Sequence, residues 1–529
     1  MKFLTAAEMR EVDRLTTERY AVPSLQLMEN AGGRVVEFLA ARFPDLPRRR
    51  IVVLCGRGNN GGDGFVVARR LRDCDANATV ILVDDPEAVR GDAAVNLKRW
   101  RDMGGELRVA RLAAEWEVAK GILPRADLVV DAMLGTGLRG PAEGMYRRAI
   151  EDLNRRGSIS IVVAVDIPSG LSSDTGVLSG EAVSADFTVT FTAPKFGQVM
   201  FPASERVGLL VVRSIGSPRQ LIEEVGKGTL RWLEPGEFAS LRLRRKPNSN
   251  KGNFGHALIV AGSRGKSGAA VLTAWAALRV GVGLVTVATP DVVQPVVAIP
   301  VPEVMTEPML STDAGTISMR SLEYGHFADL RKGKSAMGLG PGLSTHQETQ
   351  SFIRSVVEDS ALPIILDADG LNAFSGRSDT FKRRQASTLT LTPHPGEMAR
   401  LIGGIIEDVQ TRRLEVAQRA AADWDAFIVL KGHQTVVAAP DGRAWINSTG
   451  NPGMATGGTG DVLTGMLAGL AAQFGSEHWE VPLGLGVYLH GLAGDIAAAE
   501  LGEAPLMATD LIRAIPRAYA QVVSEISSE

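Results

Sequence analysis

Residues 450–461 read GNPGMATGGTGD, and an apolar pattern follows at Val462, Leu463, Met466, Leu467 and Leu470. This one-face spacing predicts a helix that begins where the glycine-rich stretch ends. Gly457, Gly458 and Gly460 lack a Cβ, so their backbone N–H groups can turn toward a phosphate, which the helix dipole also attracts. A carboxylate beside phosphate is repulsive, so Asp461 indicates a base that takes a proton from a hydroxyl attacking phosphorus. A glycine-rich turn with an N-cap aspartate stays the alternative.

The composition is that of an ordinary soluble globular protein. With 529 residues and a soft prior of about 150 residues per domain, we expect two or three domains. A net charge of −3 gives no electrostatic reason to expect a nucleic-acid or membrane partner. Cys55 and Cys74 are the only cysteines, which suits a reducing compartment, and charged side chains interrupt residues 1–15 where a signal peptide needs an apolar core. We therefore expect a cytoplasmic protein.

Short β-branched runs alternate with helical patterns in both halves of the chain, which predicts an α/β fold with parallel sheets. The runs are IVVLC (51–55), ATVILV (78–83), ADLVVDA (126–132), SIVVAVD (160–166) and DFTVTFT (186–192), and later HALIVAGS (256–263), GLVTVAT (283–289), PIILDAD (363–369) and FIVLKG (427–432). Between about 214 and 250 the pattern gives way to Gly, Pro and basic residues. We expect domains at 1–215 and 241–529 with a linker at 216–240.

In the first half, GRGNNGGDG (56–64) follows a strand and opens a helix. Its first six residues satisfy G-x-G-x-x-G, and Asp84 and Asp85 end the next strand, which favours a dinucleotide-binding dehydrogenase as one hypothesis. Asn59, Asn60 and Asp63 fit that hypothesis poorly, because they add oxygen acceptors suited to a hard cation or to substrate hydroxyls. The loop is therefore compatible with dinucleotide binding and with the binding of a hard cation or of substrate hydroxyls.

Two more loops follow strand ends, DAMLGTGLRGP (131–141) and DIPSGL (166–171). The carboxyl ends of parallel strands share one rim, so Asn60, Asp131, Asp166 and Ser169 are expected to converge on one crevice. A lone aspartate at a strand end is more often a cap than a catalyst. Three such loops on one rim favour a ligand-binding or catalytic site over three separate caps.

The motifs NNGGDG, DAMLGTGLRGP and DIPSG, followed by TAPK at 192–195, resemble the epimerase domain of the NAD(P)H-hydrate repair enzymes. The resemblance implies a Rossmann-like three-layer sandwich with a potassium site at Asn60, Asp131 and Ser169. It also implies that Asp166 transfers a proton while hydroxide leaves and returns at C6 of the hydrated nicotinamide. Lys195 is as readily a solvated residue as an orienting cation. The implied contacts with the hydrated dinucleotide are Asn59, Asn60, Gly61, Gly62, Asp63, Gly135, Thr136, Gly137, Leu138, Arg139, Gly140, Pro141 and Asp166.

The second half carries four further motifs, AGSRGKSGAA (261–270), GLGPGL (338–343), TPHPGE (392–397) and KGHQT (431–435). GSRGKS is not a P-loop, because Val260 stands where the first glycine of G-x-x-x-x-G-K-[ST] belongs. Neither H-x-H nor H-E-x-x-H occurs among the seven histidines, so a zinc hydrolase is not expected. His394 and His433 taken alone would be structural turn residues.

As an ordered set with DADGLN (367–372) and the opening stretch, these motifs resemble the ribokinase-like dehydratase domain of the same repair enzymes. The resemblance implies that Ala270, Gly342, His394 and Asp461 bind hydrated NADH or NADPH, and that ADP or ATP binds with Mg²⁺. We expect an aromatic residue where this chain has Lys266, which puts the packing of that loop in question. The implied nucleotide contacts are Lys431, Gly432, His433, Gln434, Thr435, Asn451, Pro452, Gly453, Met454, Ala455, Thr456, Gly457, Gly458, Thr459 and Gly460.

The resemblance implies a bifunctional repair enzyme that epimerises the R and S hydrates and dehydrates the S form at the expense of ADP or ATP. Two alternatives stay open: a ribokinase-like kinase of a small alcohol, and a first half that only binds ligands. We expect a homo-oligomer that takes small-molecule substrates. Leu4, Met9, Val12 and Leu15 have helical spacing, so residues 1–20 are expected to form an amphipathic helix that packs on its own domain or a neighbour.

Overall fold

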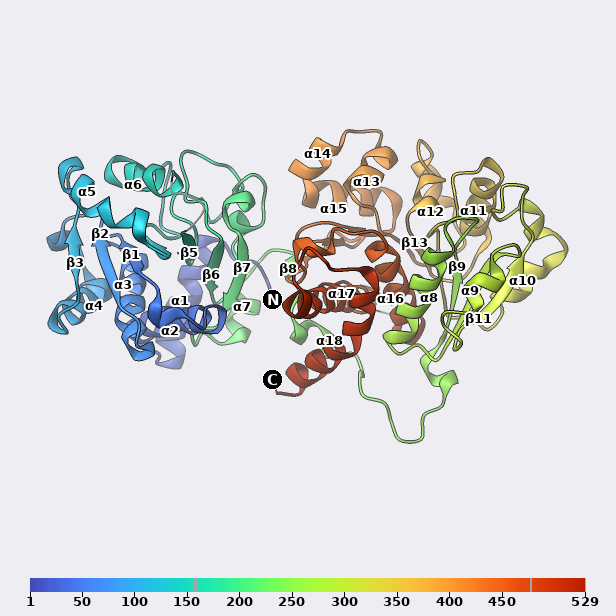
Figure 1. Ribbon diagram of the computed structural model, residues 1–529, viewed down its shortest axis with the longest axis horizontal. Helices are drawn as coiled ribbons and strands as arrows, with labels where there is room; N and C mark the ends of the chain where they lie inside the picture. Colours follow the sequence, from blue (N-terminus) through green and yellow to red (C-terminus); the bar gives the residue numbers. More distant parts are fainter. Residues whose placement is uncertain (156–159, 476–477, 529) are drawn as a thin grey trace. The chain divides into compact units, whose positions relative to one another are not determined.

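The computed structural model describes residues 1–155, 160–475 and 478–528. The chain divides into two compact units, unit 1 at Met1–Gly228 and unit 2 at Thr229–Glu529 (Figure 1). Residues 216–240, expected as a linker, contribute to both: α7 (Arg219–Val225) belongs to unit 1 and β8 (Leu230–Trp232) to the sheet of unit 2. Each unit is described by itself.

Unit 1 holds a seven-stranded sheet in the order β3-β2-β1-β4-β5-β6-β7, and every pairing is parallel. The chain order reverses between β1 and β4, which is where open parallel sheets bind ligands. The strands are β1 (Ile51–Cys55), β2 (Ala78–Leu82), β3 (Leu107–Val109), β4 (Leu128–Ala132), β5 (Ile161–Val165), β6 (Phe187–Phe191) and β7 (Leu209–Arg213).

Helices cover both faces of this sheet, as Figure 1 shows. Alternate strand residues such as Val53 and Val130 pack on α2, α3 and α4, whereas Val52 and Val129 pack on α5 and α6. Strands buried on both faces are apolar throughout, which is why IVVLC shows no alternation. The helices are α2 (Ser24–Arg42), α3 (Asn59–Leu71), α4 (Gly91–Asp102), α5 (Ala113–Ala119) and α6 (Gly144–Asn154).

Helix α1 (Ala6–Tyr20) precedes the sandwich and packs on its own unit. It begins in a capping box, in which Thr5 accepts a hydrogen bond from the backbone N–H of Glu8 and Glu8 accepts one from that of Thr5. Met9, Val12 and Leu15 lie in one cluster with Ala193, Leu221 and Ile222. The expected amphipathic helix therefore packs against α7 and the segment after β6.

Unit 2 holds a ten-stranded sheet in the order β11-β10-β9-β12-β13-β14-β15-β16-β17-β8. Strands β9 to β15 pair in parallel, and β16 pairs antiparallel with both β15 and β17. The strands are β9 (His256–Val260), β10 (Leu284–Pro290), β11 (Met305–Met309), β12 (Ala336–Leu339), β13 (Ile364–Leu366), β14 (Leu389–Leu391), β15 (Phe427–Leu430), β16 (Val436–Ala438) and β17 (Ala444–Ile446).

The main core of unit 2 lies between this sheet and α8, α16, α17 and α18. Gly465 lets α16 approach α8 closely, because a Cβ there would lie 1.9 Å from the backbone oxygen of Thr273. Leu258, Leu339 and Leu366 point to the other face and are also buried, so helices cover both faces. The helices are α8 (Ser267–Arg279), α9 (Gln294–Ala298), α10 (His326–Arg331), α11 (Gln347–Asp359), α12 (Asp369–Asn372), α13 (Pro395–Ile402), α14 (Ile406–Thr411), α15 (Arg413–Trp424), α16 (Thr459–Phe474), α17 (Glu480–Leu501) and α18 (Ala508–Ser528).

One described helix, α17, is long and apolar enough to cross a membrane by length and composition. Within its most apolar window, 67% of the residues are buried inside the protein. Leu485, Leu489 and Ala493 belong to the main core of unit 2. Core helices of soluble proteins have the same composition, so α17 is accounted for by packing.

Candidate active sites

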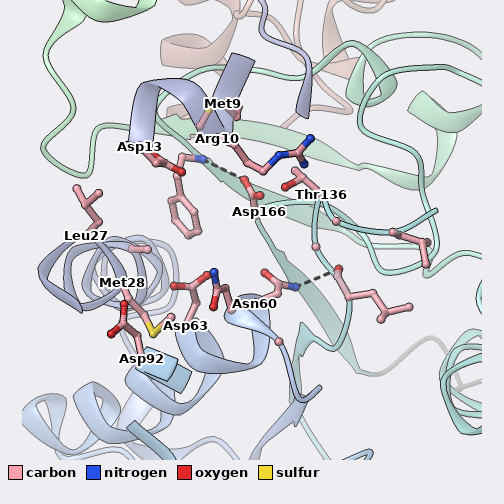
Figure 2. Close-up of a pocket in the computed structure, with 18 of the residues that line it drawn as sticks. Met9, Arg10, Asp13, Leu27, Met28, Asn60, Asp63, Asp92, Thr136 and Asp166 are labelled. Carbon is pink, nitrogen blue, oxygen red and sulfur yellow. Dashed lines mark hydrogen bonds between the residues drawn. The ribbon is translucent and has the colours of Figure 1, made fainter. Parts of the chain in front are cut away.

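Unit 1 has a cavity of about 600 Å³ at the carboxyl ends of its central strands (Figure 2). Three loops line it, those after β1, β4 and β5, together with Lys195 after β6. Helix α1 closes one side with Met9, Arg10 and Asp13. The rim that the sequence predicts to be shared therefore encloses a space large enough for a small ligand.

A buried ion pair joins Lys195 to Asp166 at the edge of this cavity. The Nζ of Lys195 donates to Oδ1 of Asp166 at 2.5 Å and to Oγ1 of Thr190 at 2.7 Å, and that hydroxyl also donates to Asp166 Oδ1 at 3.0 Å. The lysine side chain is 1% exposed and the aspartate side chain 16%. Asp166 has a φ of +64°, and Gln198 holds its backbone oxygen at 2.7 Å. The carboxylate is therefore fixed by its surroundings while it faces the cavity.

Behind the cavity, Asp131 and Ser169 form a completely buried pair. The backbone N–H and the hydroxyl of Ser169 donate to the two oxygens of Asp131 at 2.8 and 2.6 Å. Burial raises the pKa of Asp131 to about 6, although these hydrogen bonds oppose the rise. Two buried oxygens held in this way are suited to a cation.

Asn60 adds a third oxygen beside this pair. Its Nδ2 donates to the backbone oxygen of Leu134 at 3.1 Å, and the N–H of Leu134 donates to the hydroxyl of Ser169 at 2.8 Å. The Oδ1 of Asn60 is buried and accepts no hydrogen bond from any residue that the structure describes. A buried amide oxygen without a donor is unusual, and a cation would satisfy it.

Most predicted residues of unit 1 line the cavity, but six do not. Gly61, Gly62, Gly140 and Pro141 do not line the cavity, and Asp131 and Ser169 lie below its surface. Sequence reasoning missed Arg10 and Asp13, which in the sequence are two charged residues at the border of the apolar stripe of residues 1–20, a pattern that does not by itself indicate a cavity. Those that line the cavity are Asn59, Asn60, Asp63, Gly135, Thr136, Gly137, Leu138, Arg139 and Asp166.

Asp84 is engaged within the protein. Its Oδ2 accepts a hydrogen bond from the hydroxyl of Tyr146 at 2.8 Å and lies 3.7 Å from Arg57. In a dinucleotide-binding dehydrogenase, the acidic residue after this strand binds the ribose hydroxyl. The partners of Asp84 therefore weaken the dehydrogenase hypothesis.

In unit 2 a second lysine–aspartate pair lies where parallel strands end. The Nζ of Lys431, after β15, donates to Oδ1 of Asp367, after β13, at 2.6 Å and lies 3.7 Å from Glu397. The hydroxyl of Thr464 in α16 donates to Oδ2 of Asp367 at 2.7 Å. Burial lowers the pKa of Lys431, but Asp367 and Glu397 outweigh it, and the net result is a raised pKa. The lysine stays charged beside Asp461.

Asp461 lies in the first turn of α16, after Gly458 with its φ of +92°. Burial raises the pKa of Asp461 to about 6, and Asp367 adds to the rise while Lys431 opposes it. A carboxyl group tuned in this way is ionised at neutral pH yet can hold a proton. The position and the pKa both suit a general base.

Three other predicted residues have structural partners. Asn451 donates to Asp495 at 2.9 Å and caps the turn at 452–454. Nδ1 of His394 accepts from the N–H of Gly396 at 3.0 Å, so the ring caps α13, and burial lowers its pKa. Ala270 is completely buried. Asn451 and His394 therefore shape the loops even without a ligand.

Two carboxylates of DADGLN, Asp367 and Asp369, were not among the predicted site residues. Lys266, where we expected an aromatic residue, pairs with Asp369 at 2.9 Å. The side chain of Lys266 is 51% exposed and that of Asp369 13% exposed. The backbone N–H of Ser344 donates to the same oxygen of Asp369 at 2.8 Å. Lys266 thus ties the loop at 261–270 to α12 by an ion pair.

Comparisons with known proteins describe both units. The family model for NAD(P)H-hydrate dehydratase matches residues 257–517, and the model for the YjeF-related protein N-terminus matches residues 24–197. A bifunctional NAD(P)H-hydrate repair enzyme of Moorella thermoacetica is 43% identical over 532 residues, which cover 100% of this chain and 98% of that one. The repair enzyme of Escherichia coli is 34% identical over 520 residues, 97% of this chain and 93% of that one.

Among solved structures, the chain is similar to an ADP/ATP-dependent NAD(P)H-hydrate dehydratase of Bacillus subtilis that was co-crystallised with ATP and Mg²⁺. The two are 33% identical with a TM-score of 0.48, and the match covers 55% of this chain and 98% of that one.

Proposed function

Because this chain belongs to the family of bifunctional NAD(P)H-hydrate repair enzymes, we propose that unit 1 epimerises the R and S hydrates of NADH and NADPH and that unit 2 dehydrates the S form at the expense of ADP or ATP. The observation that carries the proposal is Asp461, a carboxyl group with a pKa of about 6 in the first turn of α16, directly after the glycine-rich stretch. Lys431 stands beside it.

In the dehydratase reaction, Asp461 takes the proton of the C6 hydroxyl as that oxygen attacks the terminal phosphorus of the nucleotide. The P–O bond to the leaving nucleotide breaks, and its electron pair stays on that nucleotide. N–H groups of residues 457–460 and the ammonium group of Lys431 meet the negative charge of the transferring group. The C6–O bond then breaks, phosphate departs with the electron pair, the ring nitrogen supplies electrons, and loss of a ring proton restores the dihydronicotinamide.

The nucleotide is expected to lie along Lys431–Thr435 and Asn451–Gly460, with Gly342 and His394 on the side of the hydrate. Mg²⁺ would enter with the nucleotide and neutralise phosphate charge. Within the described ranges no group of three or more His, Cys, Asp or Glu side chains could hold a metal ion. The phosphates and water would therefore supply most of the ligands.

In the epimerase reaction, we assign proton transfer at C6 to Asp166. Lys195 and Thr190 hold its Oδ1, so the carboxyl group keeps a fixed direction toward the cavity. Asp166 donates a proton to the C6 hydroxyl as the C6–O bond breaks, so that water leaves and the ring nitrogen stabilises the planar cation. Water then adds on either face and returns a proton to Asp166. The two hydrates thereby interconvert without a net change in composition.

We further propose that unit 1 holds K⁺ at Asn60, Asp131 and Ser169. The buried Oδ1 of Asn60, which lacks a donor among the described residues, supports this assignment, as does the buried carboxylate of Asp131. When bound, the cation would supply positive charge that fixes the loops after β1 and β4.

The free thiols of Cys55 and Cys74 support a reducing, cytoplasmic location. The homo-oligomer stays a prediction.

The test is to mix the purified protein with racemic hydrate of NADH, Mg²⁺ and either ADP or ATP, and to follow the absorbance of the dihydronicotinamide. We expect both isomers to be recovered with consumption of nucleotide, and only one after Asp166→Ala. No recovery with either nucleotide would overturn the dehydratase assignment. A stable phosphorylated alcohol would support the kinase alternative instead.

A further inference from the structure

Helix α1 forms part of the epimerase cavity although it lies before residue 24, where the matched segment begins. Met9, Arg10 and Asp13 line the cavity, and their spacing places them on one side of the helix. The preceding residue Leu4 donates its N–H to the backbone oxygen of Pro194 at 3.1 Å and forms a bridge with Lys195. The helix is therefore attached to the same segment that carries the lysine of the site.

Asp13 of α1 and Asp166 both lie at this cavity (Figure 2), and the carboxyl group of Asp13 interacts electrostatically with Lys195 and Asp166. Its Oδ1 is buried and has no hydrogen-bond partner in the part of the chain that the structure describes. Burial raises the pKa of Asp13 to about 6, Lys195 opposes the rise and Asp166 adds to it. A buried carboxyl oxygen without a donor costs stability, so packing alone does not explain this residue.

We propose that Asp13 is a second proton-transfer group of the epimerase, acting together with Asp166. This inference rests on the epimerase function proposed for unit 1. One of the two carboxyl groups donates a proton as the C6–O bond breaks, and the electron pair leaves with the departing water. The other accepts a proton from the water that forms the new C6–O bond on the opposite face.

Two carboxyl groups that share one proton suit a reaction that runs in both directions. Conversion of R to S moves the proton from one aspartate to the other, and the product state is the starting state for conversion of S to R. Lys195 lies near both carboxyl groups, and its positive charge offsets part of their negative charge. No oxidant, reductant or further reactant is required.

Asp63 is the other carboxyl group of the cavity with a perturbed titration. Burial raises the pKa of Asp63 well above its usual value, and Asp166 and Asp13 add to the rise. Asp63 lies on α3, the helix that also carries Asn59 and Asn60, which are expected to hold the substrate. The groups that face Asp13 are thus Lys195, Asp166 and Asp63, with Arg10 on its own helix.

The test uses the full-length protein, the isolated R hydrate of NADH, Mg²⁺ and the effective nucleotide. Asp13→Asn should slow consumption of the R hydrate by about 100-fold or more, whereas consumption of the S hydrate should not change. Glu18→Gln is the matched control, because it removes an exposed carboxylate from the same helix. The thermal midpoint of Asp13→Asn should equal or exceed that of the wild type, since the substitution removes a charged carboxylate whose buried Oδ1 has no donor among the described residues.

Two further measurements separate proton transfer from packing. Formate should restore activity toward the R hydrate in Asp13→Ala, and Asp13→Asn should lose one limb of the pH profile of R consumption. Wild-type activity in Asp13→Asn, or loss of activity in Asp13→Ala that formate does not restore, would overturn the inference while the proposed function stands. If the wild type itself does not consume the R hydrate, the epimerase function fails first.

Discussion

The lysine–aspartate pairs of the two units show opposite patterns of exposure. In unit 1 the side chain of Lys195 is 1% exposed and that of Asp166 is 16% exposed. In unit 2 the side chain of Asp367 is 1% exposed and that of Lys431 is 18% exposed. The N–O distances are 2.5 and 2.6 Å, so the chemistry of the contact is the same. In the proposed function the more accessible partner is the one that meets a ligand: a carboxylate for proton transfer in unit 1 and a cation for phosphate in unit 2.

Asp461→Asn should produce the largest effect and should affect unit 2 alone. Loss of the general base is expected to lower kcat for dehydration of the S hydrate by about 10²–10⁴-fold. The rate at which unit 1 interconverts the isomers, measured by chromatography of the same sample, should not change. Asp441→Asn, at an exposed turn, is the control. A decrease of less than tenfold would remove Asp461 from the mechanism.

Asp367→Asn should destabilise unit 2 because it leaves the buried end of Lys431 without its main counter-charge. The expected loss in free energy of unfolding is about 3–5 kcal/mol. Asp369→Asn breaks the ion pair with the exposed Lys266 and should cost less than about 1 kcal/mol. Hydrogen exchange resolved by peptide would report each unit separately. If both variants lose the same free energy of unfolding, the burial of the Asp367–Lys431 pair does not make it more important for stability than the Asp369–Lys266 pair.

Lys431→Met should act on the binding of nucleotide. A hydrogen bond to a charged group contributes about 1.5–3 kcal/mol, so KM for the nucleotide should rise by about 10- to 100-fold. Steady-state kinetics with the S hydrate would measure the change, and Lys266→Met should leave this KM unaltered. A fall in kcat at constant KM would mean that Lys431 acts only in the transition state.

The smallest expected effect is the pH dependence of dehydration. Since the pKa of Asp461 is about 6 and the base must be ionised, kcat should be constant above pH 7 and fall about tenfold per pH unit below about 6. The raised pKa of Asp461 has the opposite effect on the stability of the fold. The fold favours the protonated carboxyl group, so its contribution to the free energy of unfolding is fully present below the pKa of an unfolded aspartate, near 4. This contribution is lost as pH rises through about 6. If kcat at saturating nucleotide does not fall below about pH 6, the assignment of Asp461 as the general base is contradicted.

Hydrophobic patterning predicted the elements well where strands are buried on both faces. IVVLC and DFTVTFT correspond to β1 and β6, and the helix predicted where the glycine-rich stretch at 450–461 ends is α16 at Thr459–Phe474. The predicted fold class, a Rossmann-like sandwich followed by a ribokinase-like α/β domain, is confirmed. The pattern was weaker at 216–240, where short elements contribute to two different cores.

Site chemistry was only partly readable. Strand-end loops predicted that Asp131, Asp166 and Ser169 would lie on one rim, because parallel strands end together. Lys195 looked like a residue that could as well be solvated, yet it is buried against Asp166. Asp13 could not be identified, since helical periodicity shows which face is buried but not which polar group the border of that face will meet.

The sequence by itself determined the two α/β units, their order and the family to which the chain belongs, because periodicity and glycine-rich motifs are local properties of the chain. Only the tertiary structure decided which partner of each lysine–aspartate pair is more buried, and that the buried oxygen of Asn60 has no donor among the described residues. It also decided that Asp13 reaches the site of Lys195. Burial and pairing depend on contacts between segments that are distant in the sequence, and these contacts set the charge state on which the chemistry depends.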